Sequence, residues 1–351
     1  MNYHARSINV MKHRVVMRLI KRFLWTGLGL ALLLVAVSGW WVLTPMSFAS
    51  PTVDLAIDPQ TPVRGIAQAV ADAGVQTHPV ALYAFFRVSG QSRKLRAGSY
   101  ELSQGNTPLD LLRKLSRGEE SLKAVTLIDG WTFLQFRAAL NKAEGLKHDA
   151  QDLSDAQLMA QLGMPGVPPE GRFFPDTYTY GKGTSDLRVM QRAANAMTKQ
   201  LAAAWGQRQS DIQVKNIDQA LILASIIEKE TGRESDRTTI SRVFHNRLAI
   251  DMPLQTDPTV IYGLFDNFDG NLRRADLRTD HPWNTYTRKG LPPTPIAMPG
   301  RNALKAAVQP APSNALYFVA KGDGTSYFSA TLEEHNAAVN RYQRNRQNSG
   351  L

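Results

Sequence analysis

LILASIIEKET, residues 221–231, is the most informative stretch of the chain. The apolar side chains from Leu221 to Ile227 cover nearly the whole circumference of a helix, and such a helix is buried inside a protein. The polar residues of the segment fall in one narrow sector: Asp218, Ser225, Glu228 and Lys229. Glu230 points about 160° away from Glu228. We therefore expect a buried helix over Asp218–Thr231 that carries the carboxyl of Glu228 near its end.

The position of Glu228 suggests acid–base chemistry. Burial removes water from a carboxyl group and raises its pKa, which a general acid working near neutral pH requires. A solvated Glu–Lys pair at a helix C-terminus is the alternative, and periodicity alone does not decide between the two.

Aromatic rings interleaved with hydroxyl and amide groups occur at FFPDTYTY (173–180) and WNTY (283–286). Sugars present a matching surface of apolar ring faces edged by hydroxyls, although core packing explains isolated aromatics equally well. Gln255 to Thr259 form a polar segment that is either an ordinary turn or a ligand-contacting loop.

Around the buried helix the sequence predicts a mixed α+β chain. The predicted helices are Val63–Gly74, Pro79–Val88, Leu109–Arg117, Trp131–Lys142, Asp186–Trp205, Thr238–Leu248 and Leu332–Gln347. Strands are expected near 95–102, at Ala124–Ile128, where the strand would close a small N-terminal unit, and in a hairpin of Leu316–Ala320 with Tyr327–Ser329. Residues 47–60 are interpreted as a stalk, and residues 145–184 and 251–300 as long loops rich in Gly and Pro.

Residues 23–43 (FLWTGLGLALLLVAVSGWWVL) contain no charge and are long enough to cross a membrane once. All nearby cations precede this segment, so the positive-inside rule leaves residues 1–22 in the cytoplasm and exports the remainder. The alternative is a signal peptide cleaved near Ser47–Ala49, but its apolar region is normally shorter.

Composition excludes several classes of protein. The chain has 351 residues and a net charge of +11, but six of its 41 Lys and Arg lie in residues 1–22, and no acidic residue precedes Asp54. The rest is only mildly basic, so we expect no nucleic-acid partner. Cysteine is absent, the seven His show no metal-binding spacing, and no nucleotide-binding motif occurs. We expect no metal and no cofactor.

Eight stretches together resemble the endolytic murein transglycosylase family (MltG, YceG-like). They are residues 95–100, 170–178, 224–231, 243–248, 254–259, 284–286, 290–293 and 334–336. The resemblance implies an anchored enzyme of the bacterial inner membrane, with its catalytic domain in the periplasm. It also implies cleavage of the MurNAc–GlcNAc bond of nascent peptidoglycan glycan strands, a 1,6-anhydro-MurNAc end, and peptidoglycan synthases as partners.

The implied organisation has four parts: a basic arm (1–22), a transmembrane helix (23–43), a stalk with a small LysM-like glycan-binding α+β subdomain (44–122), and a larger α+β catalytic domain (123–347). The family's catalytic Glu falls on Glu228. Six residues are candidates for holding the sugar or tuning Glu228: Ser225, Glu170, Gln255, Asp257, Asn284 and Tyr286. Where the family commonly has a His, this chain has Ser326, to which we assign no catalytic role.

One carboxyl suffices for the implied reaction. Glu228 would protonate the glycosidic oxygen and then accept the proton of the muramyl 6-hydroxyl as this group closes onto the anomeric carbon. Two alternatives stay open: a hydrolase with Asp257 or Glu170 as second carboxylate, and a non-catalytic glycan-binding scaffold of the synthesis machinery.

Overall fold

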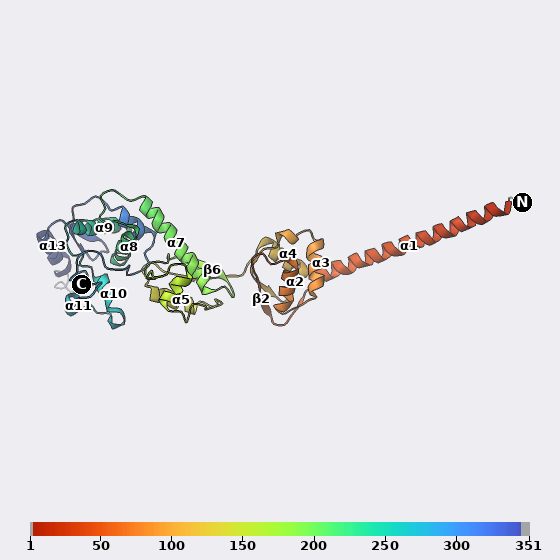
Figure 1. The fold of residues 1–351 in the computed structure, drawn as a ribbon, viewed down its shortest axis with the longest axis horizontal. Coiled ribbons are helices and arrows are strands. Elements are labelled where there is room, and N and C mark those ends of the chain that lie inside the picture. Colours follow the sequence, from red (N-terminus) through yellow and green to blue (C-terminus); the bar gives the residue numbers. More distant parts are fainter. Residues whose placement is uncertain (1–2, 345–351) are drawn as a thin grey trace. The chain divides into compact units, whose positions relative to one another are not determined.

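The computed structural model describes residues 3–344. The chain divides into two compact units, Met1–Leu122 and Lys123–Leu351 (Figure 1). Both units mix helices with short two-stranded sheets, so the α+β class expected from the sequence is confirmed.

The first unit begins with α1 (Tyr3–Leu43), a single helix of 41 residues. Its second half, Phe23–Leu43, has a mean hydropathy of 1.9, and none of it is buried inside the protein. A helix of 21 residues rises about 31 Å, which matches the hydrocarbon core of a bilayer. Length, composition and exposure therefore fit a single-pass membrane anchor.

The remainder of this unit is a small helix-and-sheet module. β2 (Thr52–Ile57) pairs antiparallel with β4 (Gly98–Ser103), and the two-residue strands β1 (Ser47–Phe48) and β3 (Val75–Gln76) pair nearby. Its helices are α2 (Val63–Asp72), α3 (Pro79–Val88), the short η1 (Ser92–Lys94) and α4 (Pro108–Arg117). Apolar faces of these helices and of β2 and β4 enclose one core.

Local sequence accounts for α4. Thr107 and Asp110 form a reciprocal capping box, Pro108 occupies the first turn, and Gly118 ends the helix in the left-handed conformation. The prediction of a stalk over residues 47–60, in contrast, was wrong, because this segment contains β2. Thr52–Ile57 (TVDLAI) alternates exposed and buried side chains as an ordinary half-buried strand does, and the flanking prolines obscured this alternation.

The second unit contains the remaining elements. The helices are α5 (Phe133–Lys142), α6 (Asp155–Gln161), α7 (Asp186–Gly206), α8 (Ile217–Glu230), α9 (Glu234–Ala249), α10 (Asp257–Leu264), η2 (Phe265–Asn267), α11 (Arg274–Arg278), α12 (Arg301–Val308), α13 (Leu332–Val339) and the π-helical η3 (Asn340–Arg344). The strands are β5 (Leu122–Thr126), β6 (Thr177–Gly181), β7 (Tyr317–Ala320) and β8 (Ser326–Ser329).

The structure corrects the expected pairing of β5 and the two expected loops. β5 pairs with β6 instead of closing the small N-terminal module. Residues 145–184, expected to be a loop, contain α6 and β6, and residues 251–300 contain α10 and α11. α12 was not expected at all.

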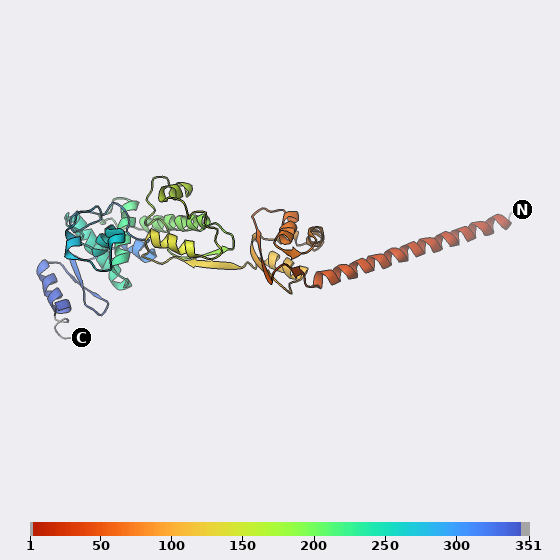
Figure 2. The ribbon, with the colours of Figure 1, turned by 90° about the horizontal axis from the view of Figure 1, so that it is seen from below.

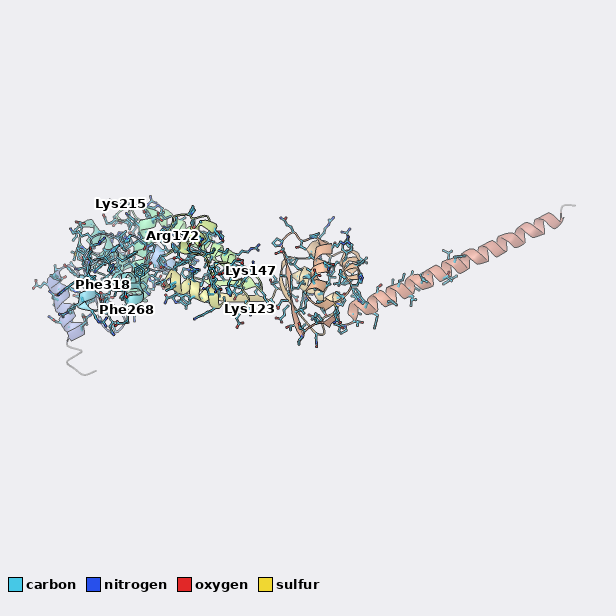
Figure 3. The ribbon with its side chains drawn as sticks, turned by 60° about the horizontal axis from the view of Figure 1, so that its bottom comes forward. Lys123, Lys147, Arg172, Lys215, Phe268 and Phe318 are labelled. Atoms are coloured by element: carbon cyan, nitrogen blue, oxygen red, sulfur yellow. The ribbon has the colours of Figure 1, made fainter. Side chains whose placement is uncertain are left out.

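The C-terminal hairpin forms as predicted, with Phe318 opposite Phe328. Phe318 packs edge-to-face on Phe244 of α9, with ring centroids 6.2 Å apart (Figure 3). α13 lies beside this hairpin (Figure 2). The predicted last helix is confirmed over its described part, because α13 (Leu332–Val339) continues directly into the π-helical η3 (Asn340–Arg344); residues 345–347 lie outside the described residues.

Candidate functional site

The helix α8 is built as the sequence predicts. Asn216 caps its N-terminus by accepting a 2.9 Å hydrogen bond from the backbone N–H of Gln219. From Ala220 to Ile227 every side chain except that of Ile222 is buried. α8 packs chiefly against α12. The chain leaves the helix at Thr231 in an extended conformation, so Glu228 lies in the last helical turn.

The carboxylate of Glu228 has two donors in the structure. Nη1 of Arg237, on α9, lies 3.3 and 3.2 Å from its two oxygens. The backbone N–H of Gly300, the N-cap residue of α12, donates to Oε2 at 2.9 Å. The side chain of Glu228 is 7% exposed. A carboxyl group is thus held in a fixed orientation while a small part of it remains open to solvent.

Two further segments meet at the same place. The turn at Gly130 lies against the end of α8: Lys229 Nζ donates to the Gly130 carbonyl at 3.2 Å. A Cβ atom at Gly130 would lie 3.7 Å from Cγ of Glu228. Gly130 in turn donates its N–H to the carbonyl of Met298 at 2.8 Å. Residues distant in sequence therefore enclose Glu228 from three sides.

Asp129 belongs to this cluster as well. A Cβ atom at Gly300 would lie only 2.7 Å from Oδ1 of Asp129, so the carboxyl of Asp129 lies directly against the start of α12. Burial raises the pKa of Asp129, while the charge of Arg237 acts in the opposite direction. Arg237 is thus placed near two carboxyl groups. Its Nη2 donates to the Thr231 carbonyl at 3.3 Å, which fixes the guanidinium to the end of α8.

Ser225 lies one turn before Glu228 and is fully buried. Its hydroxyl donates to the Ile222 carbonyl at 2.7 Å and accepts the N–H of Ile296 at 3.0 Å. This second bond fixes the segment that leads to Gly300. The hydroxyl therefore acts on Glu228 through the backbone that supplies the Gly300 donor.

Glu170 is a second buried carboxyl. It accepts the N–H of Phe133, at the start of α5, at 3.1 and 3.2 Å, and the hydroxyl of Tyr262 donates to it at 3.2 Å. Burial raises the pKa of Glu170 to about 7. Close by, Arg172 pairs with Asp218 in the first turn of α8 at 2.8 Å (Figure 3).

The other face of α8 carries Glu230. Thr256 donates its hydroxyl to this carboxyl, and burial raises the pKa of Glu230 to about 7. Beside Thr256, the exposed Asp257 accepts a 2.5 Å hydrogen bond from the hydroxyl of Tyr286. Gln255 is exposed and adopts a positive φ of 48°. The predicted residues Gln255, Asp257 and Tyr286 thus lie together, near Glu230.

Asn284 is fully buried. Its Nδ2 donates to three carbonyls around the end of α11, those of Asp276, Leu277 and Thr279, at 3.2, 3.2 and 2.7 Å. Its Oδ1 accepts the N–H of Tyr286 at 2.8 Å. All these partners are backbone groups, so the side chain holds the 276–286 segment in place.

Sequence reasoning missed Arg237 and Asp129. Arg237 comes from a different helix, beyond the Thr231–Arg233 turn, and no spacing rule connects it with Glu228. Asp129 lies in an Asp-Gly turn, and this dipeptide indicates a turn without indicating a functional site. Ser326 lies near this region through its backbone: its N–H donates to Asp236, the neighbour of Arg237, at 2.7 Å. Among the side chains that the structure describes (residues 23–265 and 267–343), no group of three or more His, Asp or Glu is arranged to hold a metal ion.

Comparison with known proteins gives consistent results. The model of the YceG-like family matches residues 55–341. A Bacillus subtilis (strain 168) protein named endolytic murein transglycosylase is 32% identical over 310 residues, which cover 83% of this chain and 85% of the relative. A protein of the same name from Streptococcus pneumoniae serotype 2 is 28% identical over 79% of this chain, although the match spans only 56% of that longer relative.

A crystal structure of a YceG-like protein from Listeria monocytogenes is also similar. It is 29% identical, has a TM-score of 0.52, and the match covers 82% of this chain and 98% of that one. The family match spans both units described above and includes the end of α8 with its surrounding segments. By sequence and by fold, the chain belongs to the YceG-like family.

Proposed function

We propose that this protein is an endolytic murein transglycosylase, the activity named for its relatives from Bacillus subtilis and Streptococcus pneumoniae. Its substrate is the glycan strand of nascent peptidoglycan, cut at the MurNAc–GlcNAc bond with formation of a 1,6-anhydro-MurNAc end. The observation that carries the proposal is the carboxyl of Glu228, enclosed at the end of a buried helix and oriented by Arg237 and Gly300.

In this proposal Glu228 transfers the proton in both directions. The protonated carboxyl donates to the glycosidic oxygen as the bond to the anomeric carbon breaks. The resulting carboxylate accepts the proton of the muramyl 6-hydroxyl, which forms the new bond to the same carbon. The nucleophile belongs to the substrate, so it is already in place and no water is consumed.

The contacts of Glu228 suit the second step directly, because a guanidinium and a backbone N–H stabilise a carboxylate. For the first step the carboxyl has to carry a proton. A bound sugar that covers the exposed part of Glu228 would exclude water from the proton transfer. Arg237 and Gly300 then stabilise the charge that appears on Glu228 as the proton leaves.

The supporting residues have separate tasks in this proposal. Gln255 and Asp257, which are exposed, and the partly buried Tyr286 offer polar groups that would hold the sugar. Ser225 and Asn284 act through the backbone segments that they fix, and Glu170 is a tuning or binding group. A hydrolase of the same bond, with Asp257 or Glu170 as second carboxylate, is the second candidate.

We further propose the four-part organisation of residues 1–22, 23–43, 44–122 and 123–347, with the first part cytoplasmic and the last periplasmic. The LysM-like assignment of the small module is supported by the order β2, α2, α3, β4, in which two helices connect two antiparallel strands. Such a module would hold the glycan near the membrane, where peptidoglycan synthases would be partners.

The test is digestion of purified glycan strands by the full-length protein in detergent, with the new ends identified by mass spectrometry. We expect shorter strands with anhydro ends. Glu228→Gln should reduce their formation at least about a hundredfold. The matched control is Glu234→Gln, a Glu whose Oε1 contacts Asn302 on the protein exterior and which should leave the rate unchanged.

Other results would contradict specific parts. Ends heavier by one water molecule would identify a hydrolase. Absence of cutting by the parent protein would identify a scaffold. Activity that survives Glu228→Gln but is lost in Glu230→Gln would move the proton transfer to the other face of α8.

A further inference from the structure

The outward side of α3 is apolar. Val80, Ala84 and Val88 are exposed and lie four residues apart, so they form one stripe along the helix. Val80 is 60% and Val88 87% exposed. Leu82 and Phe86 point the other way, into the core of the first unit. The helix thus has a buried apolar side, which the fold explains, and an exposed apolar stripe, which it does not.

The stripe lies beside the end of the membrane-spanning segment. Phe85 follows on the helix circumference directly after Val88 and Ala81. Its ring packs edge-to-face on that of Trp41, with ring centroids 6.2 Å apart. Trp41 lies in the last turn of α1, within the candidate membrane span. The neighbouring Trp40 is 70% exposed. Indole rings at this position sit at the membrane interface.

The connection between α1 and the module is short and fixed. Three residues separate Leu43 from β1, and Met46 in this link is buried and donates its N–H to the Asn106 carbonyl at 2.9 Å. α1 also contacts α4. Because this link is short and fixed, α3, whose Phe85 packs on Trp41, is held close to the bilayer surface.

Cations follow the stripe. Arg87 is next to Val88, and Arg93 and Lys94 lie in η1; all three are exposed. An apolar stripe at the interface with cations at its end is the pattern of a helix that lies on a membrane with anionic lipids.

We infer that α3 is a second membrane contact, with Val80, Ala84 and Val88 inserted among the lipid headgroups next to the point where α1 leaves the bilayer. The inference rests on the proposed anchor. The small module would then be held against the membrane instead of turning freely at the end of α1.

The experiment uses single cysteines, for which the cysteine-free chain is suited. The full-length protein is placed in lipid nanodiscs with anionic lipid, and an environment-sensitive fluorophore is attached to Val88→Cys. The matched control is Ala56→Cys, exposed on β2, whose neighbours Leu55 and Ile57 point into the core; Ala56 thus lies on the outer face of the sheet. Quenchers carried by the lipids report contact with the bilayer.

We expect the label at position 88 to shift its emission to the blue and to be quenched several-fold more strongly than the label at position 56. Adding Val80→Asp should weaken the quenching at position 88. Val80 and Val88 are both exposed, so neither Val80→Asp nor Val88→Cys should disturb the fold. Equal quenching at the two positions would overturn the inference, as would a blue shift at 88 without quenching by lipid, which indicates a protein partner. A chain that does not co-elute with the nanodiscs would refute the anchor and the inference together, whatever its activity on glycan in detergent.

Discussion

The backbone N–H of Gly300 donates a 2.9 Å hydrogen bond to the carboxylate of Glu228, although 72 residues separate them. Gly300 is the N-cap residue of α12, and Glu228 lies in the last turn of α8, the helix against which α12 packs. The packing of two buried helices thus sets the direction of one carboxyl group. Side chains that control this packing are expected to control the reaction, even where they touch no substrate.

Space at Gly300 is the first property to test. Its φ of −78° suits any residue, but a Cβ atom would lie 2.7 Å from Oδ1 of Asp129. Gly300→Ala should therefore lower the free energy of unfolding by about 1–3 kcal/mol. In an Asp129→Ala background the same change should cost much less, because the obstructing carboxyl is gone. Urea unfolding of the four proteins measures this coupling, and strictly additive effects would contradict the packing described here.

Arg237 should act as a positioning residue. The side chains of Arg237 and Glu228 are 11% and 7% exposed, so removing one leaves the other charge buried. Arg237→Ala should cost about 3–5 kcal/mol of unfolding free energy. Arg237→Lys keeps the charge but not the fork that reaches both Glu228 and Thr231, and kcat should fall about a hundredfold.

KM separates this role from substrate binding, since a positioning role lowers kcat and leaves KM nearly unchanged. Arg233→Ala is the matched control, because Arg233 contacts the Asp323 carbonyl on the exterior. A raised KM with normal kcat in Arg237→Lys would instead mean that the guanidinium binds the sugar.

Glu170 should make stability depend on pH. Its pKa is raised from 4.5 to about 7 in the folded protein, so the folded state binds the proton more tightly than the unfolded chain. The free energy of unfolding should therefore fall as pH rises from about 4.5 to about 7, by at most about 3 kcal/mol, and change little above that range through this group. Glu170→Gln keeps an acceptor for Phe133 and should remove this part of the slope.

Urea unfolding at several pH values measures that slope. Glu230, whose pKa is also about 7, contributes a slope of the same sign that Glu170→Gln should leave in place. An unchanged slope in Glu170→Gln would show that its carboxyl is not desolvated in solution.

Asn284 and Tyr286 should behave differently although they are neighbours. Asn284→Ala removes the Nδ2 amide that donates to three backbone carbonyls and should cost about 2–3 kcal/mol. Tyr286→Phe removes one hydroxyl that donates to the exposed Asp257; it should cost less than about 1 kcal/mol. Tyr286→Phe should instead raise KM for glycan. Thermal unfolding and steady-state kinetics distinguish the structural role of Asn284 from the binding role of Tyr286. A destabilised Tyr286→Phe protein with a normal KM would show that Tyr286 has a structural role instead.

The helical periodicity of the apolar residues was sufficient to predict the central helix α8. The apolar circumference of residues 221–227 predicts burial, and the angle between Glu228 and Glu230 predicts different surroundings for the two carboxyls. The structure gives them separate partners, Arg237 and Gly300 for one and Thr256 for the other. Both conclusions depend only on the geometry of a single helix, which is why they can be made from sequence.

Features that depend on tertiary pairing were not predictable in the same way. β2 was taken for a stalk because its partner β4 lies some forty residues further along the chain. α10 was taken for a loop because Pro258 was interpreted as a turn signal, whereas Pro in a first turn also starts helices. Arg237 and Gly300 reach Glu228 only through helix packing, and no local pattern marks either of them.

The segments that surround Glu228 are distant in sequence, and this affects when during folding the site is completed. Its surroundings come from residues near 130, 237 and 300, so they come together only when nearly the whole second unit has been synthesised and folded. A polypeptide that has not yet reached residue 300 has the acidic side chain but lacks the Gly300 donor. On the proposed role of Glu228, we expect such a chain to be inactive until its second unit has folded.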